Sequence, residues 1–447
     1  MHTEREDMEQ IEHPEYEFIE ASGGITEYRH RENGLQVLLM EESSAPVVTL
    51  MVTYRVGSRN ETPGLTGATH FLEHLMFKGS RKFNRENGRT VFTVLQNLGA
   101  RVNATTWLDR TNYYELLPRE HLSLAAEIEA DRMRGALLST EDVESERTVI
   151  LNELDRGENE PIRKLYDSVW STAFVEHPYH HPTIGWRPDV ERMTAAGLRS
   201  FYDTFYWPNN ATVSVIGDVG PNDALDVVSN QFGSIARAPH AFPDIDIEEP
   251  AQREERRVVV RRAGQLGAVM VAFKQPYAHH ADTDALDVLS VLLSSGKTSR
   301  LHRCLTDRGL TTSVHCSSSS LRDPGLFYVL APLSPDVEHA AVEREIVDEL
   351  RTIQEDGVTA SELSRAVSQI RAAEAFGRDG SFAVASQLNE AIAAGDWRLY
   401  TTALERYNRI TVDDLQRVAR LYCVPEASTV GYYVPEAGGE QVDVEPA

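Results

Sequence analysis

Two hydrophobic periods alternate along this chain. Segments with a period of two and many β-branched or aromatic residues predict strands, and longer segments with a period near 3.6 predict helices. Strands are expected at LQVLLMEE (35–42), at VVTLMVTYRV (47–56) and as a hairpin in 100–118 turning around Asp109 and Arg110. Helices are expected at 119–138 and at 140–156, the second with Thr140 as N-cap. Strands and helices alternate within each half, which indicates an α+β fold.

An internal repeat is visible at an offset of 217 residues. Three pairs share this offset: Thr194 with Thr411, Pro208 with Pro425, and Gly79 with Gly296. Three matches in one register indicate a duplicated unit. We therefore predict two homologous domains of the α/β-sandwich type, 1–235 and 256–447. The proline-rich, acidic segment 236–255 is expected to link them.

The apolar segment GATHFLEHLMFKGS carries unexpected chemistry. If 65–77 is a helix, His70 and His74 lie one turn apart on the same face, with Glu73 beside them. Two imidazoles at this spacing can bind one tetrahedral Zn²⁺, and the carboxylate can take a proton from water. The alternative is a buried His–Glu pair without a metal. A third ligand would favour zinc, because catalytic zinc commonly has three protein ligands.

The segment ESERTVILNEL supplies candidates for that ligand. Glu146 and Glu153 are seven residues apart, which is two helical turns, and the apolar residues between them predict a mostly buried helix. A buried carboxylate needs a partner. Zinc would satisfy Glu153, and a hydrogen bond to a ligand histidine would satisfy Glu146. Glu141 and Glu144 are expected on the solvent face.

The amino-acid composition bears on the partners and the cellular location of the protein. The net charge of −25 over 447 residues argues against a nucleic-acid partner. The apolar runs are too short to span a membrane, and the charged first residues do not resemble a secretory signal. Three cysteines without CxxC spacing predict neither disulfides nor a cysteine–zinc site. A cytoplasmic location is expected.

HFLEH followed by ERTVILNE resembles the pitrilysin/insulinase family of zinc peptidases, whose motif inverts the common zincin order. The resemblance extends over most of the chain, including NATTWLDRTNYYELLP, HPYHHPTIGW and YWPNNATVSVIGDVGP. The chain length resembles that of the branch with a single pair of repeats, which contains mitochondrial and bacterial processing peptidases. It implies that two such domains form half of a clam-shell chamber. It also implies a zinc metalloendopeptidase that hydrolyses extended peptides.

The resemblance assigns roles to individual residues. His70, His74 and Glu153 would bind zinc, Glu73 would be the general base and Glu146 would support a ligand. Asn103 and Ala104, in RVNATT, would lie on an edge strand to which a peptide adds as a further strand.

The second half departs from the family pattern. Active members carry an Arg and a Tyr around a Gly-Leu there, and alignment on Gly309 places Thr306 and Thr312 at these positions. In another register Arg303 or Arg308 could substitute for the Arg, but no tyrosine lies near. The 217 offset also places Asp287, Ser290 and Val291 where the first half has His70, Glu73 and His74. The chain thus resembles the zinc-bearing subunit of a heterodimer whose sister subunit carries the Arg/Tyr pair. The alternatives are a self-sufficient homodimeric peptidase and a non-catalytic structural subunit.

Overall fold

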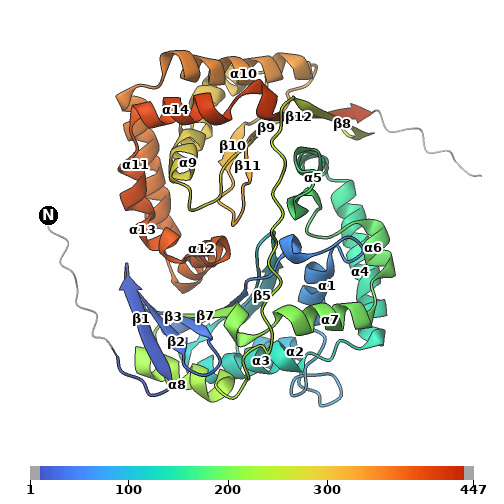
Figure 1. The fold of residues 1–447 in the computed structure, drawn as a ribbon, viewed down its shortest axis with the longest axis vertical. Coiled ribbons are helices and arrows are strands. Elements are labelled where there is room, and N and C mark those ends of the chain that lie inside the picture. The colour runs from blue at the N-terminus through green and yellow to red at the C-terminus, as the bar shows by residue number, and fades with distance from the viewer. Residues whose placement is uncertain (1–10, 437–447) are drawn as a thin grey trace, which may run out of the picture. The chain divides into compact units, whose positions relative to one another are not determined.

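The fold is taken from a computed structural model, which describes residues 11–436 (Figure 1). The chain folds into two compact units. The first unit contains residues up to Leu151, His181–Asp246 and Ala373–Leu404. The second unit contains Asn152–His180, Ile247–Ala372 and the residues from Glu405 onward. Each unit therefore draws on both halves of the sequence.

The first unit is built on a seven-stranded sheet of order β1-β2-β3-β7-β4-β6-β5. Its inner strand β4 is buried along nearly its whole length, and β7 is buried throughout, as expected for strands covered on both faces. The strands are β1 Tyr16–Ser22, β2 Ile25–His30, β3 Gln36–Glu41, β4 Val47–Tyr54, β5 Arg101–Thr106, β6 Thr111–Pro118 and β7 Ala211–Gly217. The helices are α1 Ala68–Leu75, α2 Val91–Gln96, α3 Leu122–Gly135, α4 Thr140–Glu158, α6 Arg187–Arg192, α7 Ala195–Phe205, α8 Pro221–Phe232, α12 Ser381–Ala394 and α13 Arg398–Tyr407, of which α4 and α13 run on past the division between the units.

The second unit is built on a five-stranded sheet of order β10-β11-β9-β12-β8. Its core is formed mainly by apolar side chains of strands β9 and β11 and of helices α9, α10 and α14. The strands are β8 Arg256–Ala263, β9 Ala268–Lys274, β10 His315–Ser318, β11 Leu326–Pro332 and β12 Ser428–Glu436. The helices are α5 Pro161–Ala173, α9 Ala281–Ser294, α10 His339–Asp356, α11 Ala360–Gly377 and α14 Val412–Tyr422, of which α11 runs on past the division between the units.

The predicted duplication is confirmed by topology and register. The order β3-β7-β4-β6-β5 recurs as β8-β12-β9-β11-β10, with one parallel pair at the same place in each sheet: β3 with β7, and β8 with β12. Helices α7 and α14 begin and end 217 positions apart, and so do the starts of β7 and β12. The side chains of their N-caps, Thr194 and Thr411, each accept a hydrogen bond from the backbone N–H of the residue three positions later. The mixed α and β fold expected from the sequence is therefore correct.

The two halves exchange one helix each. Helix α5, from the first half, packs on β8, β9 and β12 of the second unit, beside which it is drawn in Figure 1. Helix α12, from the second half, packs on β4 and β7 of the first unit. Residues 236–255 form neither helix nor strand. Because each compact unit combines segments of both halves, the domain boundaries at 235 and 256 stay a prediction.

Several local expectations are corrected. The histidine helix spans Ala68–Leu75 rather than 65–77. It cannot start earlier, because Gly67 has φ +86° and a Cβ there would lie 2.4 Å from the carbonyl oxygen of Ile184. It ends early because Phe77 and Lys78 bond to the third residue back.

Helix α4 begins where predicted, but its cap differs. Ser139, not Thr140, accepts the hydrogen bond from the backbone N–H of Asp142, at 3.1 Å. The helix is also less buried than its apolar residues suggested, since the side chain of Val149 is 46% exposed. Glu141 and Glu144 are exposed as expected. Between residues 11 and 436, no helix has the length and hydrophobicity needed to cross a bilayer.

Candidate metal centre

Helix α1 is anchored at its start by a buried carboxylate. Glu61 accepts hydrogen bonds of 2.7 Å from the backbone N–H groups of Gly67 and Thr69. A negative charge at a helix N-terminus is favourable because the exposed N–H groups carry partial positive charge. Burial nevertheless raises the pKa of Glu61 to about 8, although these two hydrogen bonds act in the opposite direction. A second carboxylate, Asp189, accepts a 2.7 Å hydrogen bond from the hydroxyl of Thr66. The helix therefore starts at a fixed place.

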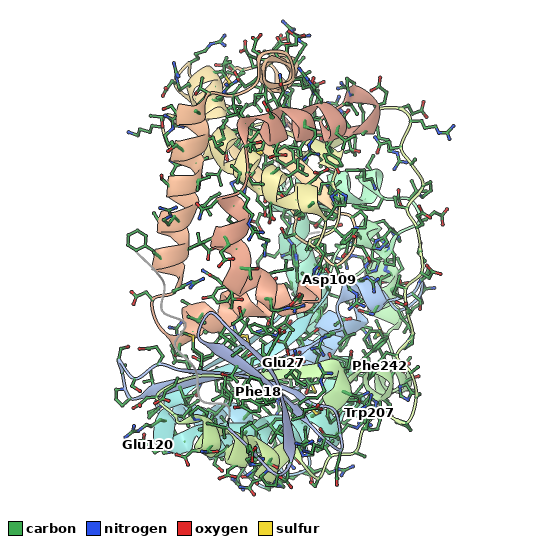
Figure 2. All side chains as sticks on the ribbon, turned by 60° about the vertical axis from the view of Figure 1, so that its left-hand side comes forward. Phe18, Glu27, Asp109, Glu120, Trp207 and Phe242 are labelled. Atoms are coloured by element: carbon green, nitrogen blue, oxygen red, sulfur yellow. The ribbon has the colours of Figure 1, made fainter. Side chains whose placement is uncertain are left out.

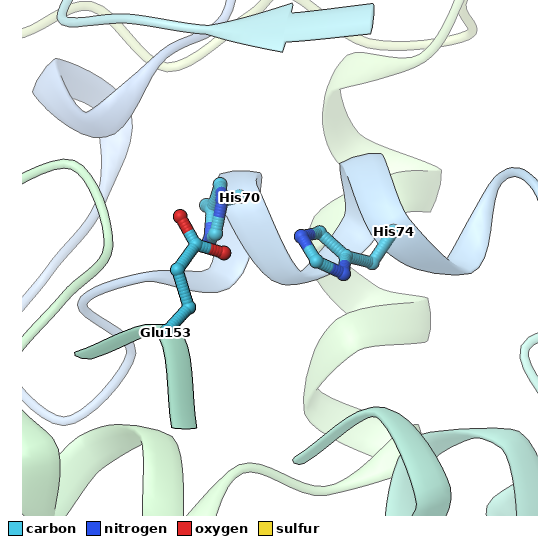
Figure 3. A group of neighbouring side chains, drawn as sticks. All are labelled: His70, His74 and Glu153. Carbon is cyan, nitrogen blue, oxygen red and sulfur yellow. The ribbon is translucent and has the colours of Figure 1, made fainter. Parts of the chain in front are cut away.

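Three predicted ligands come together at this helix. One nitrogen each of His70 and His74 and one carboxylate oxygen of Glu153 all lie within 4.8 Å of one another. In Figure 3 the two imidazoles project from α1 toward Glu153, which α4 carries. Two histidines and a glutamate are a known ligand set of catalytic zinc, and zinc bonds of about 2.0–2.2 Å place ligand atoms roughly 3.4 Å apart. The donor types fit zinc, and small side-chain rotations would close the set.

Glu146 lies beside one of the predicted ligand histidines. Glu146 Oε2 is 3.2 Å from Nδ1 of His74, and the residue is only 4% exposed. Its other oxygen, Oε1, forms an ion pair with the ammonium group of Lys78. A buried carboxylate without such partners would be strongly unfavourable. His74 is therefore oriented through the nitrogen that faces Glu146, which is how metal-binding histidines are commonly held.

Glu73 lies on the same helix but outside the donor group. Its Oε2 accepts a 2.6 Å hydrogen bond from the hydroxyl of Thr106, the last residue of β5. Strand β5 as a whole packs against α1. The carboxylate is thus held at a defined position next to the two histidines.

The predicted peptide-binding strand is at the edge of its sheet. Strand β5 pairs with β6 in antiparallel register, and the order of the described strands ends with β5. Asn103 is exposed, whereas Ala104 is 4% exposed and faces the protein. The expected hairpin is confirmed, with the turn at Trp107–Arg110 closed by a 2.9 Å hydrogen bond between the N–H of Trp107 and the carbonyl of Arg110.

The two threonines of the second half have local hydrogen bonds. The hydroxyl oxygens of Thr306 and Thr311 are 3.1 Å apart, and the exposed Thr312 donates a 3.4 Å hydrogen bond to the carbonyl of Pro332. The nearby Arg308 is paired with Glu345. In the second repeat, the position of His70 is taken by Asp287, which accepts a hydrogen bond from Tyr407 at 3.0 Å.

Sequence reasoning missed three residues around the centre: Glu61, Lys78 and Thr106. Lys78 follows His74 by four residues, a spacing that could have indicated it in the longer predicted helix, although it lies in the turn just after α1. Thr106 belongs to the NATT segment, whose alternation places it on the same side of the strand as Ala104. The sequence carries no local signal for Glu61, because its bonds depend on the path of the loop before α1.

Two family models match the chain, one within the first repeat and one running from the end of the first repeat into the second. The model described as "Insulinase (Peptidase family M16)" matches residues 36–186, which include the three donors and Glu73. The model described as "Peptidase M16 inactive domain" matches residues 192–370.

Whole-chain comparisons agree with these matches. The zinc protease PqqE of Helicobacter pylori is 32% identical over 408 residues, which cover 90% of this chain and 91% of that protein. The crystal structure of a protease from Helicobacter pylori is similar with a TM-score of 0.86 and 30% identity, covering 94% of this chain and all of that one. A probable β subunit of the mitochondrial processing peptidase of Arabidopsis thaliana is 25% identical, over 87% of this chain and 75% of that protein.

These findings define the class of protein: a peptidase-type chain of two α/β repeats, with an inverted His/Glu motif in the first repeat. The chain belongs to the insulinase family of peptidases, peptidase family M16. The resemblance inferred from HFLEH and ERTVILNE is therefore confirmed.

Proposed function

We propose that this protein is a zinc metalloendopeptidase that hydrolyses extended peptides. The observation that carries the proposal is the convergence of His70, His74 and Glu153 within 4.8 Å, with Glu73 beside them on the same helix. The names of the relatives as zinc proteases support the metal and the reaction class.

Each residue has a distinct role in this proposal. His70, His74 and Glu153 hold zinc, which supplies a Lewis acid that activates water and polarises a carbonyl. Glu73 accepts the proton of the attacking water and later delivers it to the leaving amine. Glu146 keeps His74 in the orientation and tautomer that present its other nitrogen as the ligand atom. Lys78 compensates the charge of Glu146.

The edge of β5 is the proposed binding surface for the peptide main chain. An extended peptide can add to an open strand edge through backbone hydrogen bonds, so that its side chains remain available for selection. The proposal places the peptide along Asn103 and Ala104, on the strand whose end contacts Glu73. Folded substrates lack a free backbone of this kind and would be cleaved poorly.

We further propose that this chain is the zinc-bearing subunit of a heterodimer. The support is the presence of Thr306 and Thr312 where the family resemblance expects Arg and Tyr, together with the match of the second repeat to a domain described as inactive. A non-catalytic structural subunit is the alternative. The complete donor set favours the peptidase.

Metal content and turnover of single variants test the proposal. Purified protein should contain about one zinc per chain, and His70→Ala or Glu153→Gln should lower that occupancy, because each removes a ligand. Glu73→Gln should keep zinc and lose hydrolysis, because it removes a base and no ligand. Glu141→Gln, an exposed acid on the same helix as Glu153, is the matched control and should retain both properties. Full zinc occupancy in both ligand variants would exclude the centre as drawn.

A further inference from the structure

We infer that Thr106 is a positioning residue for the general base: its hydroxyl holds the Glu73 carboxylate in the place from which it accepts the proton. This inference rests on the proposed function and extends it to a residue outside the family motif. The supporting contact is the 2.6 Å hydrogen bond from the Thr106 hydroxyl to Glu73 Oε2. Hydrogen bonds from a hydroxyl to a carboxylate are among the short and strong ones, at about 2.5–2.7 Å.

Thr106 can fix Glu73 only if its own position is fixed. The turn that follows it is attached to the loop after β4 by two backbone hydrogen bonds: Ser58 N–H to the carbonyl of Trp107 at 3.1 Å, and Arg59 N–H to the carbonyl of Leu108 at 2.8 Å. The approach is so close that a Cβ on Gly57 would lie 2.3 Å from the carbonyl oxygen of Leu108. The turn therefore cannot shift without a change in the loop.

The strand itself is held from the other side. Arg110 donates to the carbonyl oxygen of Thr105 at 3.2 Å and to its hydroxyl at 2.6 Å. Opposite Thr106 in the register, Thr111 donates a 2.9 Å hydrogen bond to the carbonyl of Val56. The end of β5 is thus determined by contacts on both sides, and a preorganised hydroxyl of this kind orients a catalytic group without cost at the moment of reaction.

Strand β5 therefore connects the proposed position of the substrate to the position of the base. The proposed peptide-binding residues Asn103 and Ala104 and the positioning residue Thr106 belong to one strand of six residues. A peptide aligned on β5 is therefore aligned with the carboxylate that takes the proton. Placement to a fraction of an ångström matters for such a transfer, because proton transfer requires hydrogen-bond reach.

The test compares two substitutions at one position. Thr106→Val keeps the shape of the side chain and removes the hydroxyl, whereas Thr106→Ser keeps the hydroxyl. We expect Thr106→Val to lower kcat by about 10–100-fold, by analogy with the range found for residues that hydrogen-bond metal ligands. KM and zinc content should stay unchanged, and Thr106→Ser should recover most of the loss. Thr204→Val, on α7, removes a hydroxyl that donates a 2.8 Å hydrogen bond to the carbonyl of Ser200 in the same helix, and it should behave as wild type.

A binding measurement makes the test independent of turnover. A peptidyl hydroxamate binds zinc and gives a proton to the neighbouring base, whereas a plain peptide of the same sequence does not. Thr106→Val should weaken the hydroxamate in parallel with kcat and leave the plain peptide unaffected. In the Glu73→Gln background it should have no further effect, because the two residues act as a unit.

Other outcomes would contradict either the inference or the proposed function. Wild-type turnover and hydroxamate affinity in Thr106→Val would overturn the inference. Loss of zinc or of plain-peptide binding would also overturn it, because it would show a structural role. Full turnover in Glu73→Gln would instead refute the proposed function itself, whatever the Thr106 variants do.

Discussion

At the scale of single residues, the most unusual group near the centre is the Glu61 carboxylate. It is 3% exposed and bonds the first N–H groups of the histidine helix. Burial raises its pKa from an ordinary value near 4.5 to about 8. Between these two pH values the unfolded chain releases the proton while the folded chain keeps it. Glu61 therefore favours the folded state most at low pH, and this contribution is lost as the pH rises toward 8.

This shift predicts a pH-dependent effect of Glu61→Gln. The free energy of unfolding of metal-free wild type should fall relative to that of the variant between pH 5 and 8, by at most about 1.4 kcal/mol per pH unit. Urea unfolding of both proteins across this range measures the difference. Glu141→Gln, which changes an exposed carboxylate, should show no such trend. A constant difference between wild type and Glu61→Gln would contradict the raised pKa.

The site was predictable where its chemistry follows helical spacing. His70, Glu73 and His74 share one helix, and Glu146 and Glu153 share another, so their relative positions follow from residue number. That the two helices meet was indicated by the family resemblance rather than by spacing. Thr106 and Glu61 reach α1 from a strand and a loop, and such contacts are set by tertiary packing, which no local pattern encodes.

At the scale of elements, the exchanged helix α12 stabilises the first unit through polar contacts that are buried at Asn389 and exposed to solvent at Glu390. Asn389 accepts a 2.7 Å hydrogen bond from Thr53 on β4 and donates one of 3.3 Å to Asn112 on β6. Glu390 pairs with Arg110, in the turn that also contains Asp109, labelled in Figure 2. Farther along, the indole of Trp397 donates a 2.7 Å hydrogen bond to Glu27, also labelled there. The second half of the sequence thus supports the sheet that carries the site.

Asn389→Leu should therefore destabilise the protein by about 1–3 kcal/mol, because Thr53 loses a buried partner. Adding Thr53→Val should cost little more or restore part of the loss, since both polar groups are then replaced by apolar ones. Thermal or urea unfolding measures the change. Asn230→Leu, at an exposed position of α8, is the control and should shift stability by less than about 0.5 kcal/mol. An equal effect of Asn230→Leu would show that the network adds nothing.

The order of helices and strands was predictable from the sequence, but the sheet on which each helix packs was not. The 217 offset paired Thr194 with Thr411, and in the structure both are N-caps of equivalent helices, α7 and α14. The exchange of α5 and α12 was missed because an amphipathic helix does not specify which sheet its apolar face will cover. The length of α1 was overestimated because the backbone of Gly67 is set by its contact with Ile184.

At the scale of the whole molecule, duplication has produced two unequal repeats. The first repeat carries the donor set, while the second places Asp287, Ser290 and Val291 at the corresponding positions of α9. Burial raises the pKa of Asp287 to about 6, and Tyr407 stabilises its carboxylate by a hydrogen bond. The second repeat thus has the same scaffold without the His/Glu motif at these positions. On the proposed function, a peptidase built from this chain would obtain the Arg and Tyr donors from a partner subunit.

This asymmetry leads to the last prediction, which concerns the partner. Because Thr306 and Thr312 replace the expected Arg and Tyr, the isolated chain should bind zinc but hydrolyse peptides slowly, since each lost transition-state donor commonly costs a hundredfold or more. A sister chain carrying the pair should restore turnover by closing around the peptide, with zinc on one wall and the donors on the other. A homodimer brings no such donors from these positions.

The experiment is a peptidase assay on the chain alone, then with the sister chain, and then with sister chains lacking the Arg or the Tyr. Rescue should require both residues of the sister chain and Glu73 of this chain. Thr306→Arg combined with Thr312→Tyr should raise the activity of the chain alone if two copies can close in the same way. Robust turnover by the unmodified chain, abolished by Glu73→Gln so that contaminants are excluded, would refute the divided site. The zinc assignment would remain, because it depends on His70, His74 and Glu153 alone.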